Sequence, residues 1–130
     1  MVIDTDILID HFHDHKAATS FIRDTLLTGR ELFISISTVA EILAGMRPGE
    51  EADTETLLSL FIICPAGESI ARAAGKYLNQ YAASHQLDLG DALIAATASH
   101  MGVKLATRNV KHYPMTDVQV VVPYERGRRE

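Results

Sequence analysis

The chain has 130 residues, 47% of them apolar, with 12 Lys and Arg against 17 Asp and Glu and a formal net charge of −5. This length fits one domain, and folding at this size buries roughly two-thirds of the unfolded chain's surface, so one core suffices. The single Cys excludes an internal disulfide. A basic excess is usual in proteins that hold nucleic acid mainly by neutralising phosphates, and it is absent here.

The N-terminal segment has neither the basic start nor the unbroken apolar stretch of a secretion signal. Its apolar runs are also far shorter than the ~20 residues of a membrane span. Cys64 lies in an apolar run and is expected to be a buried, reduced side chain. The composition therefore predicts a cytoplasmic protein with no membrane segment, and it excludes a secreted, disulfide-framed or disordered one.

Short β-branched segments alternate with segments of helical periodicity along the chain. In chain order, the sequence predicts a strand at 2–3, a helix to 12, a helix at 17–27, a strand at 32–35, a helix ended by Gly45, a helix at 51–60, a strand at 61–64, helices at 68–84 and 92–99, and strands at 104–106 and 118–122. Thr5 or Asp6 is expected to cap the first helix, and Ser37 or Thr38 the third.

This alternation predicts an α/β fold with three layers, in which a central parallel sheet of about five strands has helices on both faces. Residues 1–124 are expected to form a single domain, and residues 125–130 a charged C-terminal tail. Ligands of such folds bind beyond the carboxyl ends of the strands. The polar residues that follow strands are therefore the candidates for a functional site.

Three acidic residues from distant parts of the chain are expected at that edge. Asp4 ends the first strand, Glu41 lies about one turn into the helix after the second, and Asp91 opens the helix that leads into the fourth. Three adjacent carboxylates repel one another unless a cation lies between them, and oxygen donors suit Mg²⁺ or Mn²⁺. Such an ion activates water for attack on a phosphodiester. A plainer interpretation stays open: Asp4 and Asp91 cap helices, and Glu41 is a solvated helix residue.

Four motifs occur in order: MVIDTDILID at 1–10, SISTVAEIL at 35–43, DALIAATA at 91–98 and ATRNVKHY at 106–113. Together they closely resemble the PIN-domain family, and within it the VapC-type toxins of bacterial and archaeal toxin–antitoxin pairs. The resemblance covers essentially the whole chain. It implies a PIN fold, Mg²⁺- or Mn²⁺-dependent endoribonuclease activity, a homodimer and inhibition by a small VapB-type antitoxin.

The resemblance also assigns roles residue by residue. The family's metal-binding acids match Asp4, Glu41 and Asp91. Its hydroxyl and amide that position a carboxylate or a water match Thr107 and Asn109. These residues form the expected catalytic set. Thr5, the neighbour of Asp4, is expected to play a similar orienting role.

His112 departs from the family pattern, because relatives often carry a fourth acid at this position, three residues after the Asn. A His there binds or orients a water, contacts a phosphate when protonated, or has no role, and the change weakens the case for a second metal. Asp88, one helical turn before Asp91, is a candidate substitute acid. Its simpler role is to cap the same helix.

Several residues near this edge have two interpretations each. Arg108 and Lys111 flank the expected site, either as contacts to RNA phosphates or as solvated cations. His11 and His15 are expected to share a helix face, but no third ligand accompanies them and zinc is not expected. Three apolar side chains either pack in the core or line a groove for a partner helix: Phe12, Leu43 and Met46.

The leading interpretation is a toxin that hydrolyses RNA phosphodiester bonds with a divalent cation. A receiver or phosphatase-like domain with Asp4 as phosphoacceptor fits poorly, because no acid ends the third strand and no Lys ends the fourth. A partner-binding PIN module with a weakened or lost nuclease site is the alternative that His112 keeps open.

Overall fold

A computed structural model describes residues 1–125 of the chain; residues 126–130, most of the expected tail, lie outside the described residues. The elements follow in the order β1 (Val2–Ile3), α1 (Thr5–Phe12), α2 (Lys16–Leu27), β2 (Phe33–Ser35), α3 (Ile36–Ala44), α4 (Glu51–Leu58), β3 (Ile62–Cys64), α5 (Glu68–His85), α6 (Leu89–Met101), β4 (Leu105–Ala106), a short 3-10 helix η1 (Val110–His112) and β5 (Val120–Val121). The five strands form one parallel sheet of order β3-β2-β1-β4-β5. The predicted fold class is confirmed.

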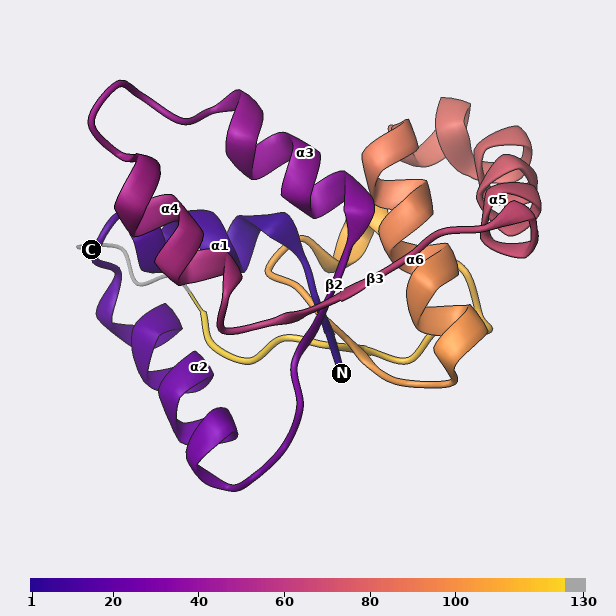
Figure 1. The fold of residues 1–130 in the computed structure, drawn as a ribbon. Helices are drawn as coiled ribbons and strands as arrows, with labels where there is room; N and C mark the ends of the chain where they lie inside the picture. Colours follow the sequence, from indigo (N-terminus) through magenta and orange to yellow (C-terminus); the bar gives the residue numbers. More distant parts are fainter. Residues whose placement is uncertain (126–130) are drawn as a thin grey trace.

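Each face of the sheet is covered by its own set of helices (Figure 1). Successive residues of a strand point to opposite faces. Val2 and Leu105 therefore enter a core formed with α5 and α6, while Ile3 and Ala106 enter a second core formed with α1, α2 and α4. All four side chains are fully buried. The strand residues are mostly apolar because helices cover both faces of the sheet.

The strand order places the ends of β1 and β4 side by side at the centre of the sheet. The chain leaves β1 towards β2 on one side, while β4 pairs with β1 on the other, so the direction of strand succession switches between them. The register pairs Ile3 with Ala106. Asp4 and Thr107, the next residue of each strand, are therefore neighbours at the switch point, which is where open α/β sheets bind ligands.

The predicted helix caps are partly wrong. The N-cap of α1 is Asp4, not Thr5 or Asp6, and its side chain makes no capping hydrogen bond. The N-cap of α3 is Ser35, whose side chain accepts a hydrogen bond from the backbone N–H of Ser37. The cap of α1 is the single residue between β1 and the helix, and the cap of α3 is the last residue of β2, so both helices begin earlier relative to their strands than predicted.

The positions of His11 and His15 also differ from the prediction. His15 is the N-cap of α2, where Nδ1 accepts from the backbone N–H of Ala18, whereas His11 lies in α1. The two His residues therefore do not share a helix face.

Cys64 is buried as expected, at 7% exposure. Within residues 1–125, none of the helices has the length and apolar character needed to cross a bilayer.

Candidate active site at the carboxyl edge of the sheet

Asp4 is held from two sides by hydroxyl groups. Its side chain is nearly buried, and Oδ2 accepts hydrogen bonds from Thr107 Oγ1 at 2.7 Å and from the Tyr113 hydroxyl at 2.9 Å. Thr107 Oγ1 in turn accepts from the backbone N–H of Asn109 at 3.0 Å. Because β1 and β4 are adjacent, the residues that follow them form these hydrogen bonds, which fix the orientation of the Asp4 carboxylate.

Asp91 combines the two roles that the sequence left open, because it takes part in capping a helix and also belongs to the acidic set. Asp88 is the N-cap of α6: its Oδ1 accepts from the backbone N–H of Asp91 at 2.8 Å, and Asp91 Oδ2 lies 3.5 Å from the backbone N of Asp88. This capping box confirms the capping role of Asp88. Asp91 Oδ1 also lies 3.3 Å from the Tyr113 hydroxyl, so Asp91 faces Asp4 across a shared donor. His112 Nδ1 lies 3.9 Å from Asp91 Oδ2.

Glu41 reaches the same edge from α3. Thr5 Oγ1 donates to Glu41 Oε1 at 2.9 Å, so the carboxylate that the Thr5 hydroxyl orients is that of Glu41. Thr38 Oγ1, completely buried in α3, lies 3.0 Å from the same Thr5 oxygen. Gly90, at the start of α6, lies against this carboxylate, since a Cβ on Gly90 would sit 3.3 Å from Glu41 Oε2.

These carboxyl groups share an environment that disfavours their charge. Burial is the largest cause of the raised pKa of Asp4. Burial, followed by the charges of Asp88 and Asp4, raises the pKa of Asp91 to about 6. Burial and the same two charges also raise the pKa of Glu41. Each acid therefore feels its neighbours, and a bound cation would relieve their repulsion.

The donor chemistry fits a hydrated Mg²⁺ or Mn²⁺ but not a cage made only of protein ligands. Among residues 1–125, no three His, Cys, Asp or Glu side chains are grouped so that together they could hold a metal ion. Mg²⁺ keeps several waters and is commonly bound through one or two carboxylates. Asp4 and Asp91, connected by the Tyr113 hydroxyl, offer such a pair.

Asp6 organises the loop that follows β4. Its Oδ2 accepts from the backbone N–H of Arg108 at 3.0 Å and from Asn109 Nδ2 at 3.2 Å. Burial, followed by the charge of Asp4, raises the pKa of Asp6 to about 7. The side-chain amide of Asn109 therefore contacts Asp6, and the predicted capping role of Asp6 is wrong because this residue connects α1 to the loop.

Arg108 takes part in a buried ion pair. Its Nε lies 2.6 Å from Asp10 Oδ2 and its Nη2 3.3 Å from Asp10 Oδ1. The hydroxyl of Tyr124 donates to the same Oδ2 at 2.8 Å. Contact between Arg108 and an RNA phosphate stays a prediction, and it competes with this ion pair. Lys111, in η1, is exposed.

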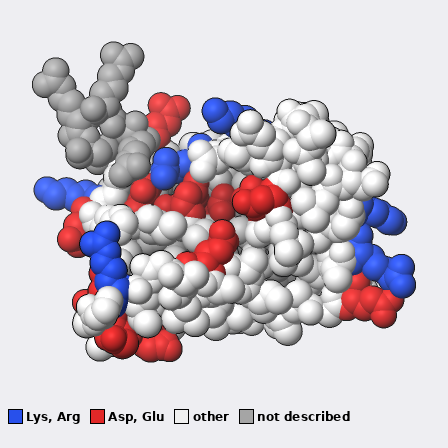
Figure 2. All heavy atoms as spheres, turned by 90° about the horizontal axis from the view of Figure 1, so that it is seen from above, with Lys and Arg blue, Asp and Glu red and all other residues white. Residues whose placement is uncertain are grey.

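Seen from above, acidic side chains gather across the middle of this face, within largely uncharged surroundings (Figure 2).

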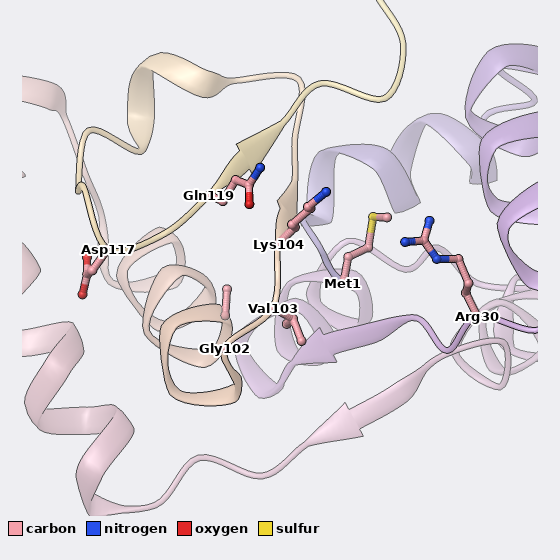
Figure 3. Close-up of a pocket in the computed structure, with 8 residues that line it drawn as sticks. Met1, Arg30, Gly102, Val103, Lys104, Asp117 and Gln119 are labelled. Carbon is pink, nitrogen blue, oxygen red and sulfur yellow. The ribbon is translucent and has the colours of Figure 1, made fainter.

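A cavity of about 200 Å³ lies between α1, α3 and α4, and it includes Glu41 among its lining residues. Phe12 and Met46 line it, whereas Leu43 is not among its lining residues and is 43% exposed. A second cavity, of about 430 Å³, lies near the amino ends of the strands and is lined by Arg30 and Lys104 (Figure 3). None of the acids described above lines this second cavity.

The sequence model of the PIN domain matches residues 1–116. The chain belongs to the PIN-domain family. It is 43% identical over 119 residues to Ribonuclease VapC10 of Mycobacterium tuberculosis, covering 88% of this chain and 86% of that protein. It is 37% identical over 115 residues to Ribonuclease VapC19 of the same species, covering 88% and 92%.

Solved structures share the fold over nearly the full length of the PIN-domain chain. A chain of a toxin–antitoxin complex from Klebsiella pneumoniae superposes with a TM-score of 0.74 at 30% identity, covering 95% of this chain and 98% of that one. A chain of FitAB bound to a DNA fragment superposes with a TM-score of 0.76 at 24% identity, covering 99% of each. The second likeness concerns the fold alone.

Proposed function

We propose that this protein is the toxin of a toxin–antitoxin pair, a ribonuclease that uses Mg²⁺ or Mn²⁺ to hydrolyse phosphodiester bonds of RNA. The observation that carries the proposal is the pair Asp4 and Asp91, joined through one hydroxyl at the switch point of the sheet. The 43% identity to a protein named as a ribonuclease supports the reaction. The raised pKa values of these acids support a cation as their partner.

On this proposal, Asp4 and Asp91 hold the ion, which when bound supplies an activated water and stabilises charge on the phosphodiester. Glu41 stands at the same edge with a raised pKa, in a position to accept a proton from water. Thr107 keeps the Asp4 carboxylate in one orientation, and Asn109 keeps Thr107 in place. These groups are the proposed catalytic set.

Three further residues are proposed as accessory groups. His112 faces Asp91 and orients a water or a substrate phosphate. Lys111 is exposed beside it and supplies a phosphate contact, as does Arg108 where its ion pair with Asp10 opens. Asp88 acts as the helix cap that sets the position of Asp91 rather than as a metal ligand.

The proposed protein partner is a VapB-type antitoxin, because structural relatives are chains of toxin–antitoxin complexes. The cavity between α1, α3 and α4 supports this partner. Phe12, Ile42 and Met46 give it an apolar lining, and its charged lining residues are Glu41, Glu50 and Arg47. An amphipathic helix with an apolar face and a basic side chain is complementary to such a lining.

The proposed assembly is a homodimer of single-domain chains, residues 1–124, in the cytoplasm. Ile36 and Leu43 of α3 are 40% and 43% exposed, and Ala40 between them is also exposed. Residues spaced by four and three positions lie on one face of a helix. This apolar stripe supports contact with a second copy of the chain.

The test is cleavage of total cellular RNA by the purified, antitoxin-free protein with Mg²⁺, Mn²⁺ or a chelator. Discrete fragments that require both a divalent cation and Asp91, with Asp91→Asn as the control, are expected. Asp4→Asn, which removes charge without changing volume, should also abolish cleavage while the protein stays folded. Retained cleavage by Asp4→Asn would overturn the site assignment. A folded protein that neither binds the cation nor cleaves RNA would instead favour the partner-binding module.

A further inference from the structure

Tyr113 places one hydroxyl group between the two proposed metal-binding acids. Its ring belongs to the core formed with α5 and α6, and the residue is only 4% exposed. The short helix η1 directly precedes it, and the backbone N–H of Tyr113 donates to the Val110 carbonyl at 3.0 Å. The apolar surroundings of the ring therefore fix where the hydroxyl can lie.

The hydroxyl contacts select one oxygen of each carboxylate. Tyr113 and Thr107 both donate to Asp4 Oδ2, and a carboxylate oxygen has about two lone-pair positions. Both of these side-chain donors therefore reach Oδ2 rather than Oδ1, while the backbone N–H of Thr5 also bonds the Asp4 carboxylate. Tyr113 also lies against Oδ1 of Asp91, at 3.3 Å. Among the described residues, Oδ2 of Asp91 lies 3.5 Å from the backbone N of Asp88 and 3.9 Å from His112 Nδ1.

We propose that Tyr113 is a positioning residue for the divalent cation: its hydroxyl holds Asp4 Oδ2 and Asp91 Oδ1, so that the opposite oxygen of each carboxylate is presented to the ion. This role rests on the metal-dependent function proposed above. Hydrogen-bond partners that orient metal ligands typically account for 10- to 100-fold in metal affinity. The phenol adds one donor, 2.9 Å from Asp4 Oδ2 and 3.3 Å from Asp91 Oδ1, whereas a fourth acid at position 112 would add another negative charge.

The experiment compares Mn²⁺ affinity of the antitoxin-free wild-type chain, Tyr113→Phe and Tyr77→Phe by titration calorimetry at pH 7.5. Tyr77 is a matched control, because it is a buried residue of the same core and its hydroxyl donates to Asp117 Oδ2 at 2.7 Å. Asp117 lines the cavity near the amino ends of the strands (Figure 3). Both substitutions remove one hydroxyl that binds a carboxylate, but only one touches the proposed site.

We expect the Kd for Mn²⁺ to rise 10- to 100-fold in Tyr113→Phe and to change less than about twofold in Tyr77→Phe. Thermal unfolding without metal checks that both variants fold. Equal affinity of Tyr113→Phe and wild type, or equal losses in both variants, would overturn the positioning role. A wild type that binds no Mn²⁺ would overturn the metal site itself and this inference with it, so the two failures are distinguishable.

If Tyr113→Phe does not fold, Thr107→Val tests the same arrangement from the other donor. Thr107 Oγ1 and the Tyr113 hydroxyl share Asp4 Oδ2, so loss of either should release that oxygen. Thr107→Ser keeps the hydroxyl and should restore the affinity. Wild-type affinity of Thr107→Val would show that the orientation of Asp4 does not depend on these hydroxyls and would overturn the inference.

Discussion

The ion pair between Asp10 and Arg108 should contribute far more to stability than a surface pair of nearly equal length. The two side chains are 3% and 21% exposed, with Nε and Oδ2 2.6 Å apart. Removing one partner of a buried pair leaves an uncompensated charge and costs about 3–5 kcal/mol. Water reaches part of the Arg108 side chain, so we expect Asp10→Ala to lower the free energy of unfolding by about 3 kcal/mol.

The matched control is Glu68→Ala, which removes a pair with a separation of 2.7 Å whose two side chains are 78% and 76% exposed. Exposed pairs at this helical spacing contribute about 0.3–0.5 kcal/mol. Urea denaturation of the wild type and both variants at pH 7 measures the difference. Similar losses in the two variants would refute the reasoning, because they would mean that separation, not burial, sets the contribution.

Three further predictions concern the acidic edge. The pKa values of Asp6 and Asp91 are raised from 3.8 to about 7 and about 6 in the folded chain. The metal-free folded protein therefore binds more protons than the unfolded chain between about pH 4 and pH 7, and its free energy of unfolding should fall as pH rises through this window. Thermal unfolding in a chelator checks this, and a midpoint that rises with pH would contradict it. Gly90→Ala should keep the unfolding midpoint, because Ala favours helices, yet lower RNA cleavage several-fold by displacing Glu41 Oε2, which would lie 3.3 Å from the new Cβ. Unchanged cleavage would place Glu41 outside the catalytic set. Thr107→Val should lower the free energy of unfolding by about 1–3 kcal/mol, because it leaves a buried oxygen of Asp4 with one donor fewer. Thr107→Ser should lose less in the same denaturation, and an equal loss would assign the effect to packing instead.

The sequence pattern alone predicts which edge of the sheet carries the acids. Asp4 comes directly after an apolar pair, and Thr107 directly follows another. In a parallel sheet such residues share an edge whatever the order of the strands. Their direct contact depends in addition on β1 pairing with β4, and nothing local to either strand encodes this order.

The partners of individual side chains are largely beyond sequence reasoning. Asp6 and Asn109 are separated by 103 positions and Tyr113 and Asp4 by 109, and neither pair has a local signature. Tyr113 lies inside a motif that resembles the family, yet only the turn made by η1 brings its hydroxyl to Asp4. The short-range error at α3 has another cause, because Ser35 and Ser37 are both good caps and only tertiary structure decides between them.

The charge distribution gives the proposed cation a role in binding as well as in chemistry. The chain carries a net charge of −5, and acidic side chains occupy the middle of the face that RNA would approach on the proposed function (Figure 2). Arg108, the cation nearest these acids along the chain after β4, is engaged with Asp10. A phosphate would therefore meet repulsion here unless a divalent ion compensates it. On the proposed function, the metal rather than a basic surface allows this acidic protein to hold a polyanion at its site.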